Sequence, residues 1–173
     1  MIRPCNFEDT DDFEAICDII NHSAEIYRDI IPAEKWTVPY FSRLELQQEI
    51  DRGVVFWGYE EIGSLTAVMG TQDVLDATLI RYLYVQRGRR GKGIGSELIA
   101  FLRQTTDRPL LANAFTQAAK AIHFYERHGF LPVDPEQKDR LLKAYWPASD
   151  HRIETYAVLA DHKARDILLT RKP

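Results

Sequence analysis

The stretch that decides the fold runs from Leu79 to Leu102 and reads LIRYLYV, then QRGRRGKGIG, then SELIAFL. Its first seven residues alternate bulky β-formers and its last seven carry a helical apolar stripe, so the middle is predicted to be a strand-to-helix turn. Gly91, Gly93 and Gly95 allow a tight turn in which several backbone N–H groups converge on one anion at the positive end of the helix. Arginine and lysine side chains surround these glycines. The stretch therefore predicts a diphosphate-binding site.

The spacing of the glycines excludes two well-known phosphate loops. A Walker A loop needs glycine five residues before its Gly-Lys pair and serine or threonine after it, but Gln86 and Gly93 stand there. A dinucleotide fingerprint needs a third glycine, and the two possible counts place Ser96 or Leu98 at that position. The predicted diphosphate therefore belongs neither to a P-loop nucleotide nor to a dinucleotide.

The pattern that does match is Arg-x-x-Gly-x-Gly, with Arg90, Gly93 and Gly95. It resembles the acyl-coenzyme A loop of the GNAT superfamily of N-acetyltransferases. A second landmark of that family, a helix ending Tyr-Glu-x-x-Gly-Phe, is matched by the segment from Ala121 to Phe130. The resemblance implies an α+β fold with a central mixed, largely antiparallel sheet and flanking helices. It also implies that the fourth and fifth strands splay apart and that the coenzyme lies in the V-shaped gap.

The hydrophobic pattern along the chain agrees with a mixed α and β domain. With 173 residues and 45% hydrophobic content, we expect one N-acetyltransferase domain over residues 1–173, with residues 161–173 as a solvated C-terminal tail. Strands are predicted at residues 1–7, 54–59, 63–72, 78–85, 109–114, 130–133 and 151–159. Helices are predicted from about residue 9, over 42–51, from the glycine turn to about 106, from 116 or 117 to 129, and over 135–145.

Composition and charge exclude several classes of protein. A formal charge of −4 argues against a nucleic-acid binder with a broad basic surface. Nowhere do 18 apolar residues run together, and the first ten residues lack an apolar secretion core, so we expect no membrane association. Cys5 and Cys17 fit free thiols in a reducing cytoplasm. The five histidines have no metal-ligand spacing, so no metal is expected.

The resemblance also implies which residues hold acetyl-coenzyme A as cosubstrate. Backbone groups of the predicted fourth strand would bind the pantetheine arm, because splayed strands leave N–H and C=O groups without ladder partners. The turn would bind the pyrophosphate, and Tyr125 would reach the coenzyme sulfur. The expected coenzyme-binding residues are Leu83, Tyr84, Val85, Arg90, Gly91, Lys92, Gly93, Ile94, Gly95, Ser96, Asn113 and Tyr125.

Acetyl transfer to an amine needs a neutral nucleophile, an oxyanion donor and a proton for the leaving thiolate. By resemblance, the Tyr125 hydroxyl supplies the proton and the Val85 backbone N–H stabilises the oxyanion. The predicted strand 78–85 contains no carboxylate to act as the general base. Four residues stay open as the general base: Tyr82, Asn113 through a water, Glu25 and Asp29. Alternatively, the amine arrives already neutral and needs no base.

The late helix departs from the family pattern at one more position. Relatives often carry an asparagine seven residues before the tyrosine, and this chain has Ala118 there. Either Asn113 or Gln117 could take over its hydrogen bond to the coenzyme. A non-catalytic acyl-coenzyme A-binding or regulatory module is therefore one alternative to an enzyme.

The acceptor is expected to be the primary amine of a small molecule. The segment 24–41 is rich in aromatic residues and broken by two prolines, which is typical of a loop that lines an apolar pocket. From it we expect Tyr27, Trp36 and Tyr40, together with Tyr82, to bind the acceptor. A protein or peptide acceptor is the alternative, and it would need an open groove. Residues 146–148 are apolar and are open to two interpretations, a homodimer contact or a cover over a loop.

Overall fold

The computed structural model describes residues 1–8, 10–147 and 152–170, and its centre is a seven-stranded sheet. The strand order is β1-β2-β3-β4-β5-β7-β6, and every neighbouring pair is antiparallel except β4 and β5, which are parallel. The strands are β1 (Ile2–Pro4), β2 (Val55–Glu61), β3 (Ser64–Val74), β4 (Ala77–Val85), β5 (Leu110–Phe115), β6 (Leu131–Pro132) and β7 (Tyr156–Ala160). This is the α+β architecture that the sequence predicts.

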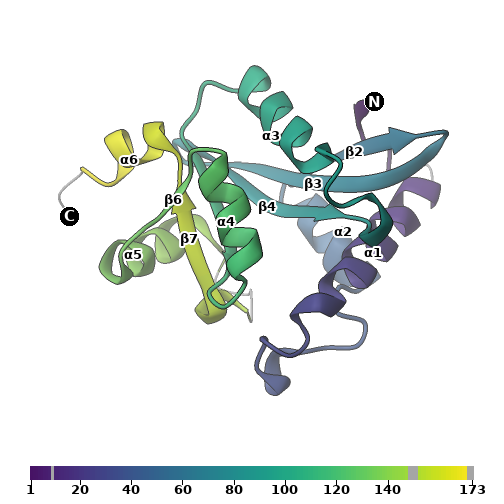
Figure 1. The fold of residues 1–173 in the computed structure, drawn as a ribbon, viewed down its shortest axis with the longest axis horizontal. Helices are drawn as coiled ribbons and strands as arrows, with labels where there is room; N and C mark the ends of the chain where they lie inside the picture. The colour runs from purple at the N-terminus through teal and green to yellow at the C-terminus, as the bar shows by residue number, and fades with distance from the viewer. Residues whose placement is uncertain (9, 148–151, 171–173) are drawn as a thin grey trace.

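Helices cover both faces of this sheet (Figure 1). Leu98 of α3 and Tyr125 of α4 share a buried cluster with one face, whereas Ile16 of α1 and Leu46 of α2 pack on the other. Leu141 of α5 packs on the C-terminal strands. The α-helices are α1 (Thr10–Ala24), α2 (Arg43–Asp51), α3 (Ile94–Thr105), α4 (Ala119–Arg127), α5 (Pro135–Tyr145) and α6 (His162–Leu168), and the 3₁₀ turns are Glu25–Tyr27, Ala33–Lys35, Arg87–Arg89 and Ile153–Thr155.

The sheet splits between β4 and β5. The parallel register extends only from Thr78 opposite Leu110 to Ile80 opposite Ala112. Beyond it, β4 continues beside β3 alone while β5 continues beside β7, and Figure 1 shows the two halves diverging. The predicted splay of the fourth and fifth strands is therefore confirmed, and it leaves one side of β4 unpaired from Arg81 onward.

One prediction about the C-terminal part of the chain was wrong. The last strand begins at Tyr156, because the preceding residues form a 3₁₀ turn, and residue 151 lies outside the described residues. The tail expected to be solvated begins with α6, whose residues are mostly exposed or half-buried. This helix buries Ala164 and Leu168 and is capped by Asp161 through a 2.8 Å bond from the Ala164 N–H. Small and apolar side chains at helical spacing give α6 a buried face that the neighbouring charges obscured in the sequence.

Trp146 is also part of this packing. Its side chain is 4% exposed and lies in the cluster formed by α5, α6 and the C-terminal strands. It therefore covers the core of its own chain and offers no surface to a second copy. Ala148, the end of that apolar segment, lies outside the described residues.

Candidate functional site

The strand-to-helix turn adopts the conformation that its glycines predict. Gly91 and Gly93 have φ values of +76° and +85°, in the left-handed region that favours glycine, and Gly93 is the N-cap of α3. Gly95 serves a different purpose, because a Cβ at this position would lie 3.1 Å from the Phe124 ring of α4. The turn therefore directs backbone N–H groups outward at the positive end of α3. The absence of a side chain at Gly95 lets α3 and α4 pack closely.

The unpaired edge of β4 supplies further backbone donors. The Gln86 N–H bonds to the Thr66 carbonyl, so Tyr84 also faces β3, and the alternate residues Leu83 and Val85 present their N–H groups to the gap. The Val85 carbonyl already accepts bonds from the Ser23 hydroxyl at 3.2 Å and from Arg90 Nε at 3.1 Å. The N–H groups of Leu83 and Val85 are thus the gap-facing donors that an amide-containing ligand could use.

Arg90 has a different partner from the one that the motif predicts. Its guanidinium donates to the carbonyls of Val85 and Ser23, the latter at 3.0 Å, and so ties the end of β4 to the end of α1. Its contact with a phosphate stays a prediction.

A groove of about 590 Å³ runs along the turn and the gap. Of the residues predicted to bind the coenzyme, Lys92 and Asn113 are not among those that line this groove. The predicted residues that do line it are Leu83, Tyr84, Val85, Arg90, Gly91, Gly93, Ile94, Gly95, Ser96 and Tyr125. Cationic side chains of Arg89, Lys120 and Arg127 line it as well. The glycine turn, the outward N–H groups and these cations fit a diphosphate joined to an amide-containing arm, which is the chemistry of coenzyme A.

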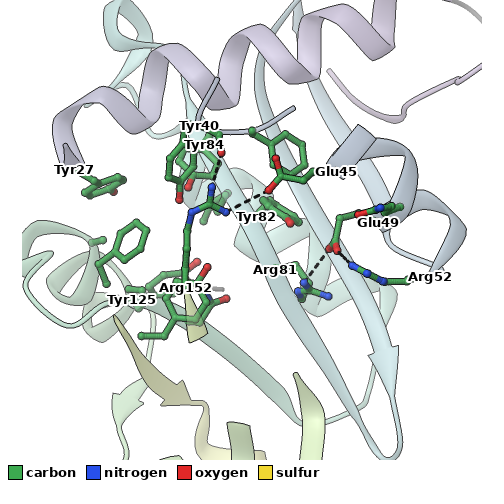
Figure 2. Close-up of a pocket in the computed structure, with 18 residues that line it drawn as sticks. Tyr27, Tyr40, Glu45, Glu49, Arg52, Arg81, Tyr82, Tyr84, Tyr125 and Arg152 are labelled. Atoms are coloured by element: carbon green, nitrogen blue, oxygen red, sulfur yellow. Dashed lines mark hydrogen bonds and ion pairs between the residues drawn. The ribbon is translucent and has the colours of Figure 1, made fainter. Parts of the chain in front are cut away.

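A second, smaller cavity of about 150 Å³ adjoins the groove (Figure 2). Tyr27, Leu83, Tyr84, Ala121 and Tyr125 line both spaces, so the two meet where these side chains lie. The cavity is lined by Tyr40 and Tyr82, two of the predicted acceptor residues, whereas Trp36 lies behind Tyr40 with its ring 5.1 Å away and lines neither space.

Tyr125 is held at this junction by the packing of α4. Its side chain is buried, with the rings of Phe124 and Phe130 at 5.4 and 5.5 Å. Burial, assisted by the nearby Tyr27 hydroxyl, raises the pKa of Tyr125 above its usual value. No described residue accepts or donates a hydrogen bond at its hydroxyl, which therefore stays protonated and available to a ligand.

Charged residues that the sequence analysis did not select occupy the far end of the cavity. The Glu49 carboxylate contacts two guanidinium groups, Arg81 Nη2 and Arg52 Nη1, each at 2.9 Å. Arg81 reaches the cavity because it is the extra residue of a β-bulge, between Gly70 opposite Tyr82 and Thr71 opposite Ile80. Figure 2 shows this cluster on the opposite side of the cavity from Tyr27 and Tyr125.

Arg152 crosses the middle of the cavity from the turn before β7. Its Nη2 donates to the Tyr40 carbonyl at 2.5 Å, and its Nη1 lies 3.6 Å from Glu45 Oε1 (Figure 2). The other Glu45 oxygen accepts the Ser42 N–H at 2.8 Å in a capping box that begins α2. The guanidinium also lies 4.2 Å from the Tyr40 ring centre, a cation–π contact that helps fix the cavity wall.

Asn113 has an acceptor atom without a partner. It stands on β5 at the point where this strand has left β4, and it lines the cavity. Its Oδ1 is buried and makes no hydrogen bond to any described residue. Such an atom is costly unless a ligand or water satisfies it, so it marks a contact point for a donor.

The candidates for the general base are now separated by position. Tyr82 and Asn113 line the cavity, whereas Glu25 and Asp29 are exposed and line neither space. The substitutes considered for the family asparagine also differ, because Gln117 is exposed and Asn113 faces the cavity. Ala118, at the family position itself, is buried.

Residues 52–132 match the family model described as the acetyltransferase (GNAT) domain. The protein carries a GNAT acetyltransferase domain. Such a domain is an acyltransferase, and the matched residues include the whole glycine turn, β4, β5 and α4. The sequence comparison with curated proteins found no match.

Solved structures share this GNAT fold at low sequence identity. The PaiA N-acetyltransferase of Thermoplasma acidophilum, in complex with coenzyme A, has a TM-score of 0.67 and 17% identity, covering 93% of this chain and 97% of that chain. The ribosomal-protein-S18-alanine N-acetyltransferase of Escherichia coli has a TM-score of 0.63 and 18% identity, covering 93% and 92%. A GNAT acetyltransferase of Elizabethkingia anophelis with acetyl-CoA bound has a TM-score of 0.59 and 13% identity, covering 93% and 96%.

The charged part of the cavity lining was the part that sequence reasoning missed. Glu45, Glu49 and Arg152 come from outside the matched residues, and Arg52 and Arg81 have no motif around them. The one available signal was the capping pattern Ser42-x-x-Glu45, which predicts a helix start and not a pocket. Within the described residues, no helix is both long and apolar enough to span a bilayer, and no cluster of three or more potential metal ligands occurs.

Proposed function

We propose that this protein transfers the acetyl group of acetyl-coenzyme A to the primary amine of a small molecule. The observation that carries the proposal is the junction at Tyr125, where the coenzyme-sized groove meets a small polar cavity. A cavity of about 150 Å³ is of the order that holds one benzene-sized molecule, which suits a small acceptor.

In this proposal the backbone of β4 and the glycine turn bind the cosubstrate. The N–H groups of Leu83 and Val85 bond to the arm, and the turn from Gly91 to Ser96 binds the pyrophosphate. Leu83 lines both spaces and Val85 lines only the groove, so the Leu83 N–H is the better-placed oxyanion donor of the two. Acetyl-coenzyme A supplies an activated acetyl group as a thioester.

Tyr125 is proposed to donate the proton that the leaving sulfur requires. During transfer the neutral acceptor nitrogen bonds to the acetyl carbon, the carbon–sulfur bond breaks, and the sulfur takes the Tyr125 proton. The nitrogen releases one proton to solvent, and the Tyr125 phenolate regains one from solvent, so the overall reaction gives an N-acetyl amine and a free thiol. A phenol whose pKa is raised by burial keeps its proton at neutral pH, which a general acid must do. Asn113 Oδ1 is proposed to accept a hydrogen bond from the amine and so aim its lone pair at the thioester.

A panel of primary amines tests this function directly. The protein is mixed with acetyl-coenzyme A, free thiol is followed with a chromogenic disulfide, and the N-acetyl product is identified by mass spectrometry. The proposal expects amine-dependent thiol release with a matching product. Tight coenzyme binding without amine-dependent release would instead indicate the non-catalytic binding module.

A protein N-terminus is the second candidate acceptor. It is favoured by the structural likeness to the E. coli ribosomal-protein-S18-alanine N-acetyltransferase, at a TM-score of 0.63. The cavity volume disfavours it, because a peptide of several residues needs more room than about 150 Å³. Adding peptides that begin with alanine to the same assay separates the two candidates, since a peptide turned over faster than every free amine would reverse their order.

A further inference from the structure

The charges around the acceptor cavity are unequal. Among the described residues that line it, the cationic side chains are Arg52, Arg81 and Arg152, and the anionic ones are Glu45 and Glu49. Burial holds the pKa values of the lining tyrosines Tyr27, Tyr40, Tyr84 and Tyr125 above the usual value, so these hydroxyls add no negative charge at neutral pH. The lining therefore carries one net positive charge.

The carboxylate oxygens of this lining already have partners. Both oxygens of Glu49 are paired with guanidinium groups, and those of Glu45 face Arg152 and the Ser42 N–H. The single Glu49 carboxylate is thus paired with both Arg52 and Arg81. The excess positive charge of the lining therefore belongs to the cluster of Glu49, Arg52 and Arg81. A second cationic group on an acceptor would meet arginines here, whereas an anionic group would restore the charge balance.

Arg52 is the member of the cluster that can reach a ligand most readily. It is the C-cap residue of α2, its side chain is 38% exposed, and it lines the cavity. Arg81, by contrast, is 3% exposed, forms an ion pair with Glu49 and donates a hydrogen bond to Gln72. A planar guanidinium with donors left over is suited to bidentate binding of a carboxylate.

We propose that the acceptor amine carries a carboxylate at its other end, and that Arg52, beside Arg81 and Glu49, recognises it. This inference rests on the proposed acetyl transfer to a small amine, whose nitrogen lies at the Tyr125 end. The charged cluster lies on the opposite side of the cavity, so amine and carboxylate are separated by the length of the cavity (Figure 2). The substrate class is therefore that of small ω-amino carboxylates, not diamines or polyamines.

Matched acceptors of equal length test the proposal. For each chain length, from glycine to 6-aminohexanoate, the carboxylate is compared with its primary amide and with the diamine, which differ mainly in charge. We expect kcat/KM to be at least about tenfold higher for the carboxylate than for the amide at the best length, and lowest for the diamine. A diamine or amide that matches or exceeds every carboxylate would overturn the inference while leaving the acetyltransferase function intact.

Arg52→Gln tests the residue itself. We expect the ratio of kcat/KM for carboxylate over amide to fall about tenfold, mainly through KM, and Arg52→Lys to recover part of it. Arg165→Gln is the matched control, because Arg165 is an exposed arginine of α6 that lines neither space. An unchanged ratio in Arg52→Gln, with the melting temperature of wild type, would assign recognition elsewhere. If no amine at all were acetylated, the proposed function would fail first.

Discussion

The groove and the cavity meet at Tyr125 but are built in different ways. The groove takes much of its lining from three short runs of consecutive residues, Leu83 to Val85, Arg89 to Gly91 and Gly93 to Ser96, and presents backbone N–H groups. The charged lining of the cavity comes from three distant places, α2, the bulge in β4 and the turn before β7. Backbone donors suit a ligand that is the same in every relative, whereas dispersed side chains can change one at a time. The family model matches residues 52–132, which hold most of the groove lining, whereas Glu45, Glu49 and Arg152 of the cavity lie outside the match.

The largest effect is expected where the two regions meet. Tyr125→Phe removes the proposed acid but keeps the packed ring, so kcat should fall by about 10² to 10⁴, the usual contribution of general acid catalysis. The dissociation constant for coenzyme A, measured by calorimetry, should change much less. Wild-type kcat in this variant would show that Tyr125 only packs the core.

A substitution in the glycine turn should affect the groove alone. Gly93→Val forces a β-branched residue to φ +85°, which costs about 1–3 kcal/mol or moves the amides at the start of α3. We expect about a tenfold weaker coenzyme A affinity by calorimetry. Gly63→Val is the control, because Gly63 also has positive φ (+72°) and open space around its Cβ but lies in the β2–β3 turn. Equal losses of affinity in both variants would mean that strain, not the site, is responsible.

A substitution at Asn113 should affect the cavity alone. Asn113→Ala removes the Oδ1 that lacks a protein partner, so we expect the KM for the amine to rise about three- to tenfold, as for the loss of one hydrogen bond. Coenzyme A affinity should stay within about twofold, since Asn113 does not line the groove. The reverse pattern, weaker coenzyme binding with an unchanged amine KM, would make Asn113 the substitute for the family asparagine.

The smallest effect concerns stability at alkaline pH. Burial raises the pKa of Cys17 to about 11, of Cys5 to about 12, and of Tyr125 above its usual value. Groups with raised pKa bind more protons folded than unfolded, so stability is full below the unfolded values, about 8.5 for thiols and 10 for tyrosine, and declines above them. Urea unfolding should therefore show a falling midpoint above about pH 9. Above pH 10, Tyr125→Phe should flatten the decline in the free energy of unfolding by at most about 1.4 kcal/mol per pH unit. The same slope in the variant and the wild type would mean that other groups cause the loss of stability.

The sequence by itself determined the glycine turn of the groove. The glycine spacing, the strand before it and the helix after it fix a local turn, and local turns depend on φ and ψ preferences that the residues carry with them. The α+β class and the splay of β4 from β5 followed from the family resemblance that the glycine turn and the segment Ala121 to Phe130 carry. The boundaries of the last strand and the buried face of α6 did not, because both depend on contacts with distant elements.

Only the tertiary structure decided the charged lining of the cavity. Glu49 and Arg81 are separated by 32 positions, and Arg81 faces the cavity because a bulge shifts the alternation of β4 by one residue. Tyr40 and Arg152 are 112 positions apart and form one wall. Neither pair has a periodic or motif signal, because side chains that converge through the fold need no fixed spacing along the chain. The partners of Arg90 could not be predicted from the motif for the same reason. They are the carbonyls of Val85 and Ser23, which belong to a strand and a helix that only folding brings together.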